Sequence, residues 1–340
     1  MLQSILSNSV LNIHLPLELP IMTATPSKLP ISVLIPAKNE EANLPACLES
    51  VAVADEIFVV DSQSKDRSVE IAESYGAKVV QFYFNGTWPK KKNWALKNLP
   101  FQNEWVLIVD CDERIPRELW EEIAAAIKDP KYAGYYLNRK VFFLGRWIKY
   151  GGRYPDWNLR LFKHEKGEYE NLKTEDVPNT GDNEVHEHVI LKGEVGYLKT
   201  DMLHIDFRDV YHWLERHNRY SNWEARLYLN YLIGKDDLET INNETDSLKR
   251  LVSIVKNPVQ RKRFLRKVWV WLPFKPMLRF ILTYIIQLGF LDGKAGYIYA
   301  RLMSQYEYQI GVKLYELNNF GGQLNVKASN SPSSPLKSKI

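Results

Sequence analysis

The chain has 340 residues, of which 45% are hydrophobic and 12% aromatic, and its formal net charge is +4. This length and apolar content suit one large core or two modest ones, and they exclude a generally disordered protein. The two cysteines, Cys47 and Cys111, exclude a disulfide framework and a cysteine-rich zinc site, and they favour a reducing compartment.

The two ends of the chain differ in composition from the part between them. No Lys or Arg precedes Lys28, and Asn, His and Pro interrupt the apolar stretches, so residues 1–29 lack the pattern of a signal peptide and are predicted to form a flexible leader. Residues 318–340 are rich in Gly, Ser, Pro and Lys, with few large apolar side chains. That composition predicts a disordered tail.

Apolar strands alternate with helices from residue 31 onward. "ISVLI" (31–35) is typical of a buried strand, and the spacing of apolar residues in 39–51 predicts a helix after it. The same unit recurs, with a strand ending at Val60 and a helix closed by Gly76. Further strands are predicted in "AKVVQF" and "EWVLIVDCDE", with a helix in "KKKNWALKNL" between them. This order predicts an α/β fold with a mostly parallel sheet and helices on both faces.

Polar residues gather where three of these strands end. They are Pro36 to Glu40, Asp61 with Ser62, and Asp110 with Asp112. Ligands of parallel sheets bind beyond the carboxyl ends of the strands, so these residues are the site candidates. No Gly-x-Gly-x-x-Gly or Walker sequence follows any strand, so another group must neutralise a bound phosphate. Two carboxylates two residues apart suit a divalent cation that also binds phosphate oxygens.

These segments together resemble a known family. "ISVLIPAKNEEANLPACLESV", "IFVVDSQSKDRS" and the Asp-x-Asp of "VLIVDCDE" resemble the inverting GT-A-fold glycosyltransferases of family 2, in the expected order and at the expected distances. "YGGRYPDWNLRLFK", "VHEHV", "MLHIDF" and "PMLRFILTYIIQLGFLDGKAGYIYA" resemble the branch that includes lipopolysaccharide-core β-glucosyltransferases. The likeness reaches about Leu317. It implies a metal-dependent enzyme that uses a nucleotide diphosphate sugar, with a UDP-sugar favoured.

The resemblance also implies residue roles. It places Pro36, Ala37 and Glu40 at the nucleoside, Asp61 at the nucleobase, and Lys92, Asn93 and Cys111 near the nucleotide. It also places Asp110 and Asp112 on Mg²⁺ or Mn²⁺, with His204 as a further metal ligand from later in the sequence. The cation would stabilise the negative charge that develops on the leaving diphosphate.

A catalytic base is expected in addition to the metal. The resemblance places Glu187 of "VHEHV" in this role, while the acidic pair Glu175-Asp176 remains an alternative. An acceptor hydroxyl must lose its proton as it attacks, which requires one carboxylate on the far face of the donor sugar. A single base without a covalent intermediate implies inversion of configuration.

Structural explanations compete with several of these roles. Asp110 and Asp112 could cap the helix that follows them, and Asp61 could form an Asx turn. Lys90 and Lys91 are expected to lie on a solvated face. The pair His186 and His188 could form a zinc site with His204, although that would leave the upstream motifs without a purpose. These alternatives are weaker because none of them accounts for all three strand ends.

The second half of the chain is predicted to be helical, from residue 207 to 317. Between Lys249 and Leu291 there are ten Lys or Arg and no Asp or Glu, with Trp269, Trp271 and Phe274 among them. This composition is typical of helices in a membrane interface beside anionic lipid. The longest uncharged run, 280–291, has twelve residues, fewer than the roughly 20 that a membrane span needs. Alternatively, "FILTYIIQLGFL" could be a buried helix with solvated basic flanks.

The sequence therefore predicts a GT-A catalytic domain (30–206) followed by a helical, membrane-interfacial region (207–317). The expected partners are a nucleotide-sugar donor, a lipid-linked glycan acceptor and an anionic membrane surface, and no nucleic acid. The expected location is the cytoplasm, on the inner face of the plasma membrane. A sugar nucleotidyltransferase is less favoured because "PAKNEEAN" lacks a Gly-rich basic loop. A non-catalytic sugar-nucleotide-binding module is less favoured because Asp110, Asp112 and Glu187 are present.

Overall fold

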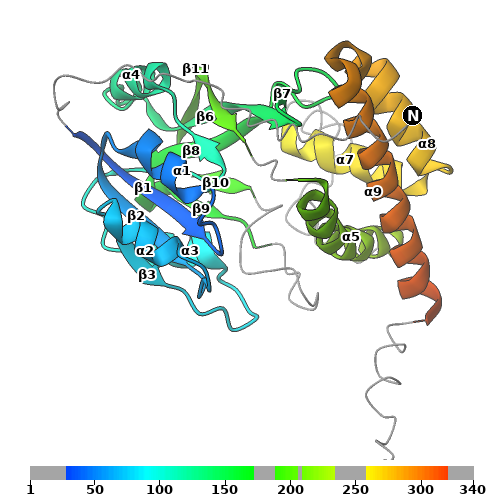
Figure 1. The fold of residues 1–340 in the computed structure, drawn as a ribbon, viewed down its shortest axis with the longest axis horizontal. Coiled ribbons are helices and arrows are strands. Elements are labelled where there is room, and N and C mark those ends of the chain that lie inside the picture. Colours follow the sequence, from blue (N-terminus) through cyan, green and yellow to red (C-terminus); the bar gives the residue numbers. More distant parts are fainter. Residues whose placement is uncertain (1–27, 172–187, 206–208, 234–257, 321–340) are drawn as a thin grey trace, which may run out of the picture.

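A computed structural model gives the fold of the chain and describes residues 28–171, 188–205, 209–233 and 258–320. Figure 1 shows a sheet with its covering helices beside a group of C-terminal helices. The predicted leader 1–29 and tail 318–340 lie almost entirely outside the described residues. The last described helix ends at Phe320, three residues past the predicted boundary at residue 317.

The main sheet combines parallel and antiparallel strands. Its strand order is β3-β2-β1-β4-β8-β6-β11-β5, with β7 paired to β6 and a separate β9–β10 pair. The strands are β1 (Leu29–Ala37), β2 (Ala54–Asp61), β3 (Lys78–Gln81), β4 (Trp105–Ile108), β5 (Glu113–Arg114), β6 (Tyr132–Phe143), β7 (Arg146–Trp147), β8 (Trp157–Lys163), β9 (Gly167–Tyr169), β10 (Val189–Leu191) and β11 (Glu194–His204). Strands β1 to β4 are parallel to one another, as predicted. Strand β8 is antiparallel to both of its neighbours.

Helices cover both faces of this sheet, as the sequence predicts. On one face, α1 (Leu44–Val51), α2 (Ser68–Ser74) and α4 (Arg117–Ala126) contribute to a core with the strands. On the other face, α3 (Lys91–Asn98) and β9 pack on a second core. Strands β1, β2 and β4 bury their apolar side chains between these two cores, which is why they are apolar throughout.

The C-terminal helices pack on one another around two apolar clusters, one of which includes the end of β6. These helices are α5 (Val210–Leu232), α7 (Pro258–Trp271), α8 (Lys275–Phe280) and α9 (Gly293–Phe320). Trp213 of α5 and Tyr299 of α9 are buried with Phe143 and Ile148. Asp292, just before α9, accepts hydrogen bonds from the backbone N–H groups of Lys149 and Tyr150 at 3.3 and 2.8 Å. The helices are therefore anchored to the sheet domain.

The apolar segment 280–291 is not one buried helix. After α8 the chain forms a π-helical turn, Ile281–Ile286, and then a 3-10 turn, Gly289–Asp292. Ile285, Ile286 and Leu291 are 51%, 66% and 46% exposed, so the alternative of a buried helix is wrong. Among the helices that the structure describes, none is both long and apolar enough to cross a bilayer.

Candidate active site

The polar ends of β1, β2 and β4 lie at one edge of the sheet. Ala37 pairs with Asp61 in the β1–β2 register, and the Ser62 N–H donates to the Ala37 carbonyl at 3.0 Å. Val109, directly after β4, donates its N–H to Leu34 of β1, also at 3.0 Å. Asp110 and Asp112 follow at the same edge. The three predicted strand ends are therefore together in the fold.

Asp110 lies between two buried cations. Its Oδ2 is 2.5 Å from a terminal nitrogen of Arg160, and its Oδ1 is 3.0 Å from Lys92 Nζ. Burial by itself would raise the pKa of this carboxyl, but Arg160 and Lys92 hold the pKa of Asp110 well below its usual value. Asp110 is therefore a fixed negative charge at neutral pH.

Glu113 is the anchor of this group. Its side chain is fully buried, and its Oε2 accepts the backbone N–H of Asp110 at 2.8 Å. Its Oε1 is 2.9 Å from Arg160 and 3.3 Å from Arg139, which also pairs with Asp156 at 2.7 Å. Glu113 therefore fixes both the backbone at Asp110 and the cation that binds it. We call Asp110, Glu113, Lys92, Arg139 and Arg160 the sheet-edge cluster.

A bulge in β8 directs Arg160 into this cluster. Tyr135 and Tyr136 of β6 face Leu161 and Leu159 of β8, so Arg160 is the extra residue between them. Bulges near active sites commonly re-aim a side chain in this way. Arg160 was not among the predicted site residues. Its signal was a charged residue between the apolar residues Leu159 and Leu161 of "WNLRLFK".

Asp112 and His204 are distant in sequence but adjacent in space. Strand β5 pairs with the end of β11, with His204 opposite Glu113, and the Ile205 N–H donates to the Asp112 carbonyl at 2.8 Å. This pairing leaves Asp112 Oδ1 3.4 Å from His204 Nδ1. Burial opposes protonation of the imidazole, but the Asp112 carboxylate raises the pKa of His204 above its usual value.

The number of metal ligands from the protein is small. In the part of the chain that the structure describes, no three His, Cys, Asp or Glu side chains form a metal-binding group. Asp112 and His204 could supply one oxygen and one nitrogen ligand, and Asp110 is two residues from Asp112 in the sequence. Neither Asp110 nor Asp112 caps the next helix, because α4 has Pro116 at its N-cap position and no side-chain cap. The helix-cap alternative is therefore wrong.

Asp61 is buried at the β2 end with its carboxylate fixed. One oxygen accepts the backbone N–H of Ser64 at 2.9 Å and the side-chain amide of Gln81 at 3.0 Å, and the other accepts the Ser64 hydroxyl. Asp61 therefore does form the local turn that its sequence allows, and this turn orients the carboxylate. Glu40 lies on the neighbouring loop, where its carboxylate accepts the side-chain amide of Asn43 at 2.8 Å.

The lysines at the start of α3 are buried, which corrects the expectation for two of them. Lys90 and Lys91 are 8% and 2% exposed, and Lys91 Nζ donates to the Ala37 carbonyl at 2.9 Å. The prediction of a solvated face was wrong because α3 begins against the strand ends, where both lysines are buried and the Ala37 carbonyl accepts the Lys91 ammonium group. Lys92 reaches Asp110, and its Nζ lies 5.6 Å from the centre of the Tyr169 ring.

Two candidate residues, Asn93 and Cys111, form hydrogen bonds within the protein. Asn93 is fully buried, and its side-chain amide both donates to and accepts from the backbone of Tyr169 at 2.8 Å. Cys111 is 4% exposed, with its Sγ 3.4 Å from the Pro36 carbonyl. Burial raises the pKa of both Cys47 and Cys111, so the thiols stay protonated at neutral pH. Asn93 and Cys111 hold their neighbours in place.

Glu187 lies outside the described residues, as do Glu175, Asp176 and His186. The structure resumes at His188, directly before β10. The His188 ring is about half exposed, with its Nδ1 3.1 Å from Glu170 Oε1. Strand β10 pairs with β9, and Asn93 ties β9 to α3. The expected base thus remains a prediction.

Comparison with known proteins gives consistent matches. A family model described as Glycosyl transferase family 2 matches residues 32–181. The lipopolysaccharide core biosynthesis glycosyltransferase LpsC of Rhizobium meliloti is 26% identical over 316 residues, which cover 88% of this chain and 97% of LpsC. An uncharacterised glycosyltransferase of Rickettsia conorii is 30% identical over 208 residues, which cover 58% of this chain and 69% of that protein.

Solved structures give weaker matches. A crystal structure of TarS from Staphylococcus aureus matches at 17% identity with a TM-score of 0.38, and the match covers 83% of this chain and 91% of that chain.

Proposed function

This chain belongs to glycosyl transferase family 2 and is a glycosyltransferase, and we propose that it transfers a sugar from a nucleotide-sugar donor to a membrane-associated glycan with inversion of the anomeric configuration. The observation that carries this proposal is the meeting of Asp112 and His204 beside Asp110 at the strand ends. A carboxylate and an imidazole there, next to two buried cations, suit a metal-bound diphosphate.

The Asp112–His204 pair fits a divalent cation. Adjacent ligands of an octahedral ion with bonds of about 2.1 Å lie about 3 Å apart, close to the 3.4 Å between these two atoms. Such ions commonly take few protein ligands and complete their coordination with substrate phosphates and water. We infer that Asp112 and His204, supported by Asp110, hold Mg²⁺ or Mn²⁺, which when bound would stabilise the charge on the leaving diphosphate.

The residues around this pair would bind and orient the donor. The proposed contacts of the nucleoside are Pro36, Ala37 and Glu40. Asp61 is the proposed hydrogen-bond partner of the nucleobase. The turn that fixes the Asp61 carboxylate supports this role, because a preoriented acceptor costs less to order on binding. Lys92 is the proposed phosphate contact, since its ammonium group already lies at the carboxylate that faces the site.

Proton removal from the acceptor is assigned to Glu187 as a proposal. A carboxylate on the far face of the sugar accepts the proton of the attacking hydroxyl, and direct displacement then inverts the anomeric centre. The UDP form of the donor, the lipopolysaccharide-like acceptor and the cytoplasmic location are also proposals. The name of LpsC supports the acceptor class, since LpsC is a lipopolysaccharide core enzyme.

The helical region supports a membrane-associated acceptor. Large apolar side chains are exposed over α7, α8 and the turns that follow. They include Phe264, Leu265, Trp271, Phe274, Met277, Ile285 and Ile286. From Pro258 to Leu291 this segment carries seven Lys or Arg and no Asp or Glu. Exposed apolar groups combined with positive charge favour an anionic membrane surface.

A donor screen tests the enzymatic part of this proposal. Melting temperatures are measured with UDP-, GDP- and dTDP-sugars, each with and without Mn²⁺. A bound donor stabilises the native state by mass action, so one nucleotide should raise the melting temperature more with Mn²⁺ than without it. No stabilisation by any nucleotide sugar in the presence of Mn²⁺ or Mg²⁺ would contradict the proposed donor class.

Vesicle flotation tests the membrane part. Changing Arg261, Lys262 and Arg263 together to Gln should weaken binding to anionic vesicles by about 1 kcal/mol per charge near the surface. Arg266 is left unchanged because it lies beside the buried carboxyl of Glu224. Donor-induced stabilisation should be the same in this variant as in the wild type. A wild type that fails to bind anionic vesicles at low salt would contradict membrane association.

A further inference from the structure

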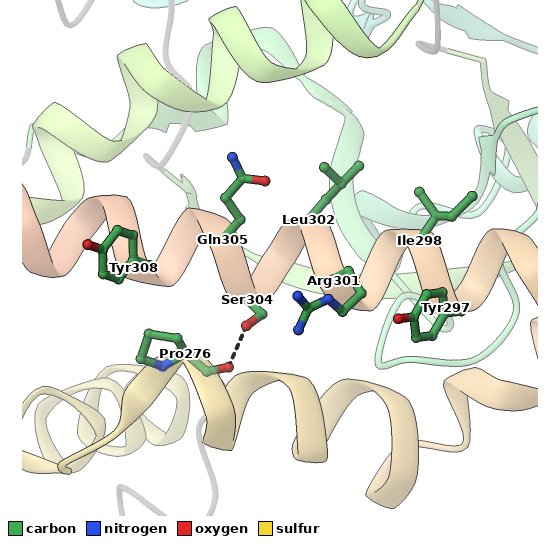
Figure 2. A pocket seen from close by; sticks show the side chains of 8 residues that line it. All are labelled: Pro276, Tyr297, Ile298, Arg301, Leu302, Ser304, Gln305 and Tyr308. Atoms are coloured by element: carbon green, nitrogen blue, oxygen red, sulfur yellow. Dashed lines mark hydrogen bonds between the residues drawn. The ribbon is translucent and has the colours of Figure 1, made fainter.

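A groove of about 550 Å³ runs along α9 beside the start of α8 (Figure 2), in the helical region and not at the sheet edge. Its lining residues are Pro276 of α8 and, from α9, Tyr297, Ile298, Arg301, Leu302, Ser304, Gln305 and Tyr308. Figure 2 shows Ser304 pointing toward Pro276, whose carbonyl accepts the Ser304 hydroxyl at 2.7 Å, with Arg301 between Ser304 and Tyr297. This bond fixes the two helices beside each other.

Arg301 is the cation of this groove. Its guanidinium lies 5.8 Å from the centre of the Phe280 ring. Among the described residues, no carboxylate forms an ion pair with Arg301. The two acidic residues nearest in sequence are buried and engaged: Asp292 accepts backbone N–H groups, and Glu307 pairs with Arg279 at 3.1 Å. The charge of Arg301 is therefore available to an anion.

Aromatic rings form the wall beside Arg301. Phe280 stacks on Tyr284 with ring centres 5.2 Å apart, and Tyr297 meets Tyr284 edge-on at 5.6 Å. Met277, Ile281 and Ile285 are 57%, 37% and 51% exposed at a spacing of four residues along the same segment. Arg301 thus lies beside aromatic rings, and the segment that carries Phe280 and Tyr284 also exposes apolar side chains. A cation next to apolar surface suits a ligand with an anionic head and an apolar body.

We propose that this groove binds one anionic phospholipid of the membrane, with its phosphate at Arg301 and its apolar part against Ile298 and Leu302. The proposal rests on the membrane association proposed above and deepens it, because it assigns a discrete lipid site in addition to a charged surface. Charge complementarity supports an anionic lipid: from Pro258 to Tyr306 the sequence holds only one acidic residue, the buried Asp292. A guanidinium binds phosphate through paired charge-assisted hydrogen bonds.

Calorimetry with a short-chain lipid tests this site directly. The full chain is titrated with dihexanoyl-phosphatidylglycerol below its micelle concentration, so that no bilayer is present. We expect saturable binding, and affinity at least tenfold lower for dihexanoyl-phosphatidylcholine. Arg301→Gln should weaken phosphatidylglycerol binding roughly tenfold, the worth of a charged hydrogen-bonded contact. Lys294→Gln removes an exposed charge outside the groove and should leave binding unchanged.

A second measurement uses only the wild type. Glycerophosphate has the anionic head without acyl chains and should bind at least tenfold more weakly than the short-chain lipid. Equal affinity for glycerophosphate would overturn the lipid assignment in favour of a simple phosphate site. Equal affinity for phosphatidylcholine, unchanged binding in a folded Arg301→Gln variant, or no binding to the wild type would each overturn the proposal. Since neither donor nor vesicle is used, its failure is distinct from failure of glycosyl transfer or of vesicle binding.

Discussion

Each half of the described chain contains a carboxylate that pairs with a guanidinium and is at least partly shielded from solvent. At the sheet edge, Asp110 pairs with Arg160; among the helices, Glu307 pairs with Arg279. Both pairs join segments that are distant in sequence. They differ in how far each carboxylate is closed to solvent.

The interhelical cluster, which we define as Glu307, Arg279, Tyr228 and Trp269, is closed. The Glu307 side chain is 1% exposed, and its oxygens accept hydrogen bonds from Tyr228, Trp269 and Arg279 at 3.2, 3.0 and 3.1 Å. A buried carboxylate surrounded by donors in this way holds its helices in one arrangement but offers no oxygen to a ligand.

The sheet-edge cluster is partly open. The side chain of its member Asp110 is 25% exposed, and that of Asp112, which lies next to the cluster, is 19% exposed, while Glu113 is fully buried. The buried Glu113 holds the cluster together. Asp110 and Asp112 are open to solvent at the end of the strands, where ligands of parallel sheets bind. Full burial of both carboxylate oxygens is typical of a structural ion pair, whereas a partly exposed carboxylate beside fixed cations is typical of a binding site.

The largest expected effect concerns the base that should complete the open site. Glu187→Gln removes the proton acceptor but preserves shape, so donor binding should persist while transfer falls about 10²- to 10⁴-fold. Initial rates with the cognate acceptor measure transfer, and the Mn²⁺-dependent melting shift measures donor binding.

Asp176→Asn is the matched control for this variant. It removes a carboxylate from the other candidate pair and should have a mild effect. The opposite order of effects would move the base to Glu175 and Asp176. A product with retained anomeric configuration would contradict both assignments, because one base on the far face of the donor can only invert.

The next effect concerns the closed interhelical cluster. Arg279→Met leaves the buried Glu307 carboxylate without its cation, so the free energy of unfolding should fall by about 3–5 kcal/mol. Urea denaturation measures this change. Turnover of the folded fraction should stay within a few-fold of the wild type, since the cluster is proposed to have no catalytic part.

Arg117→Met provides the stability control. It breaks an exposed ion pair in which Arg117 Nε lies 3.0 Å from Glu121 Oε1. The free energy of unfolding should change by no more than about 0.5 kcal/mol. Equal destabilisation by the two variants would show that burial of the interhelical cluster adds nothing to its stability.

A smaller effect depends on pH in the helical half. Burial lowers the pKa of His217 to about 4, and its ring stacks on Trp213 with centres 3.5 Å apart. The unfolded chain binds a proton near pH 6.5, so this contribution to stability is complete above that pH and is lost as pH falls toward 4. The loss should be roughly 3 kcal/mol over this window.

Comparison of the wild type with His217→Gln measures this contribution. The free energy of unfolding of both proteins is measured by urea denaturation at pH 7 and at pH 4. The loss of stability between these two pH values should be larger in the wild type, and the excess should equal the contribution of His217. Parallel pH profiles for the two proteins would contradict a neutral, buried His217.

Sequence reasoning was strong where local pattern determines structure. The parallel strands β1 to β4 and the polar residues at their ends follow from apolar runs that stop at Asp61 and Asp110. It was weak where distant segments meet. The bulge that directs Arg160 and the β5–β11 pairing that joins Asp112 to His204 depend on strand register, which no local pattern specifies.

Exposure was also difficult to predict for single residues. A run of lysines is usually solvated, yet Lys91 is buried because the carbonyl of Ala37 lies within reach. The segment 280–291 is apolar enough for a buried helix, but a π-helical turn and a 3-10 turn interrupt it and leave several apolar side chains exposed. For Lys91, a tertiary contact overrides the tendency of the sequence.

The role of the open sheet edge in holding a metal-bound diphosphate is tested most directly by a Mn²⁺ titration of transferase activity in the wild type and in Asp112→Asn. We expect the wild type to require the cation after chelation, and the variant to lose turnover by orders of magnitude while keeping its melting temperature, with excess Mn²⁺ restoring little. Activity near that of the wild type in Asp112→Asn, or full activity of the wild type in the presence of chelator, would contradict this role.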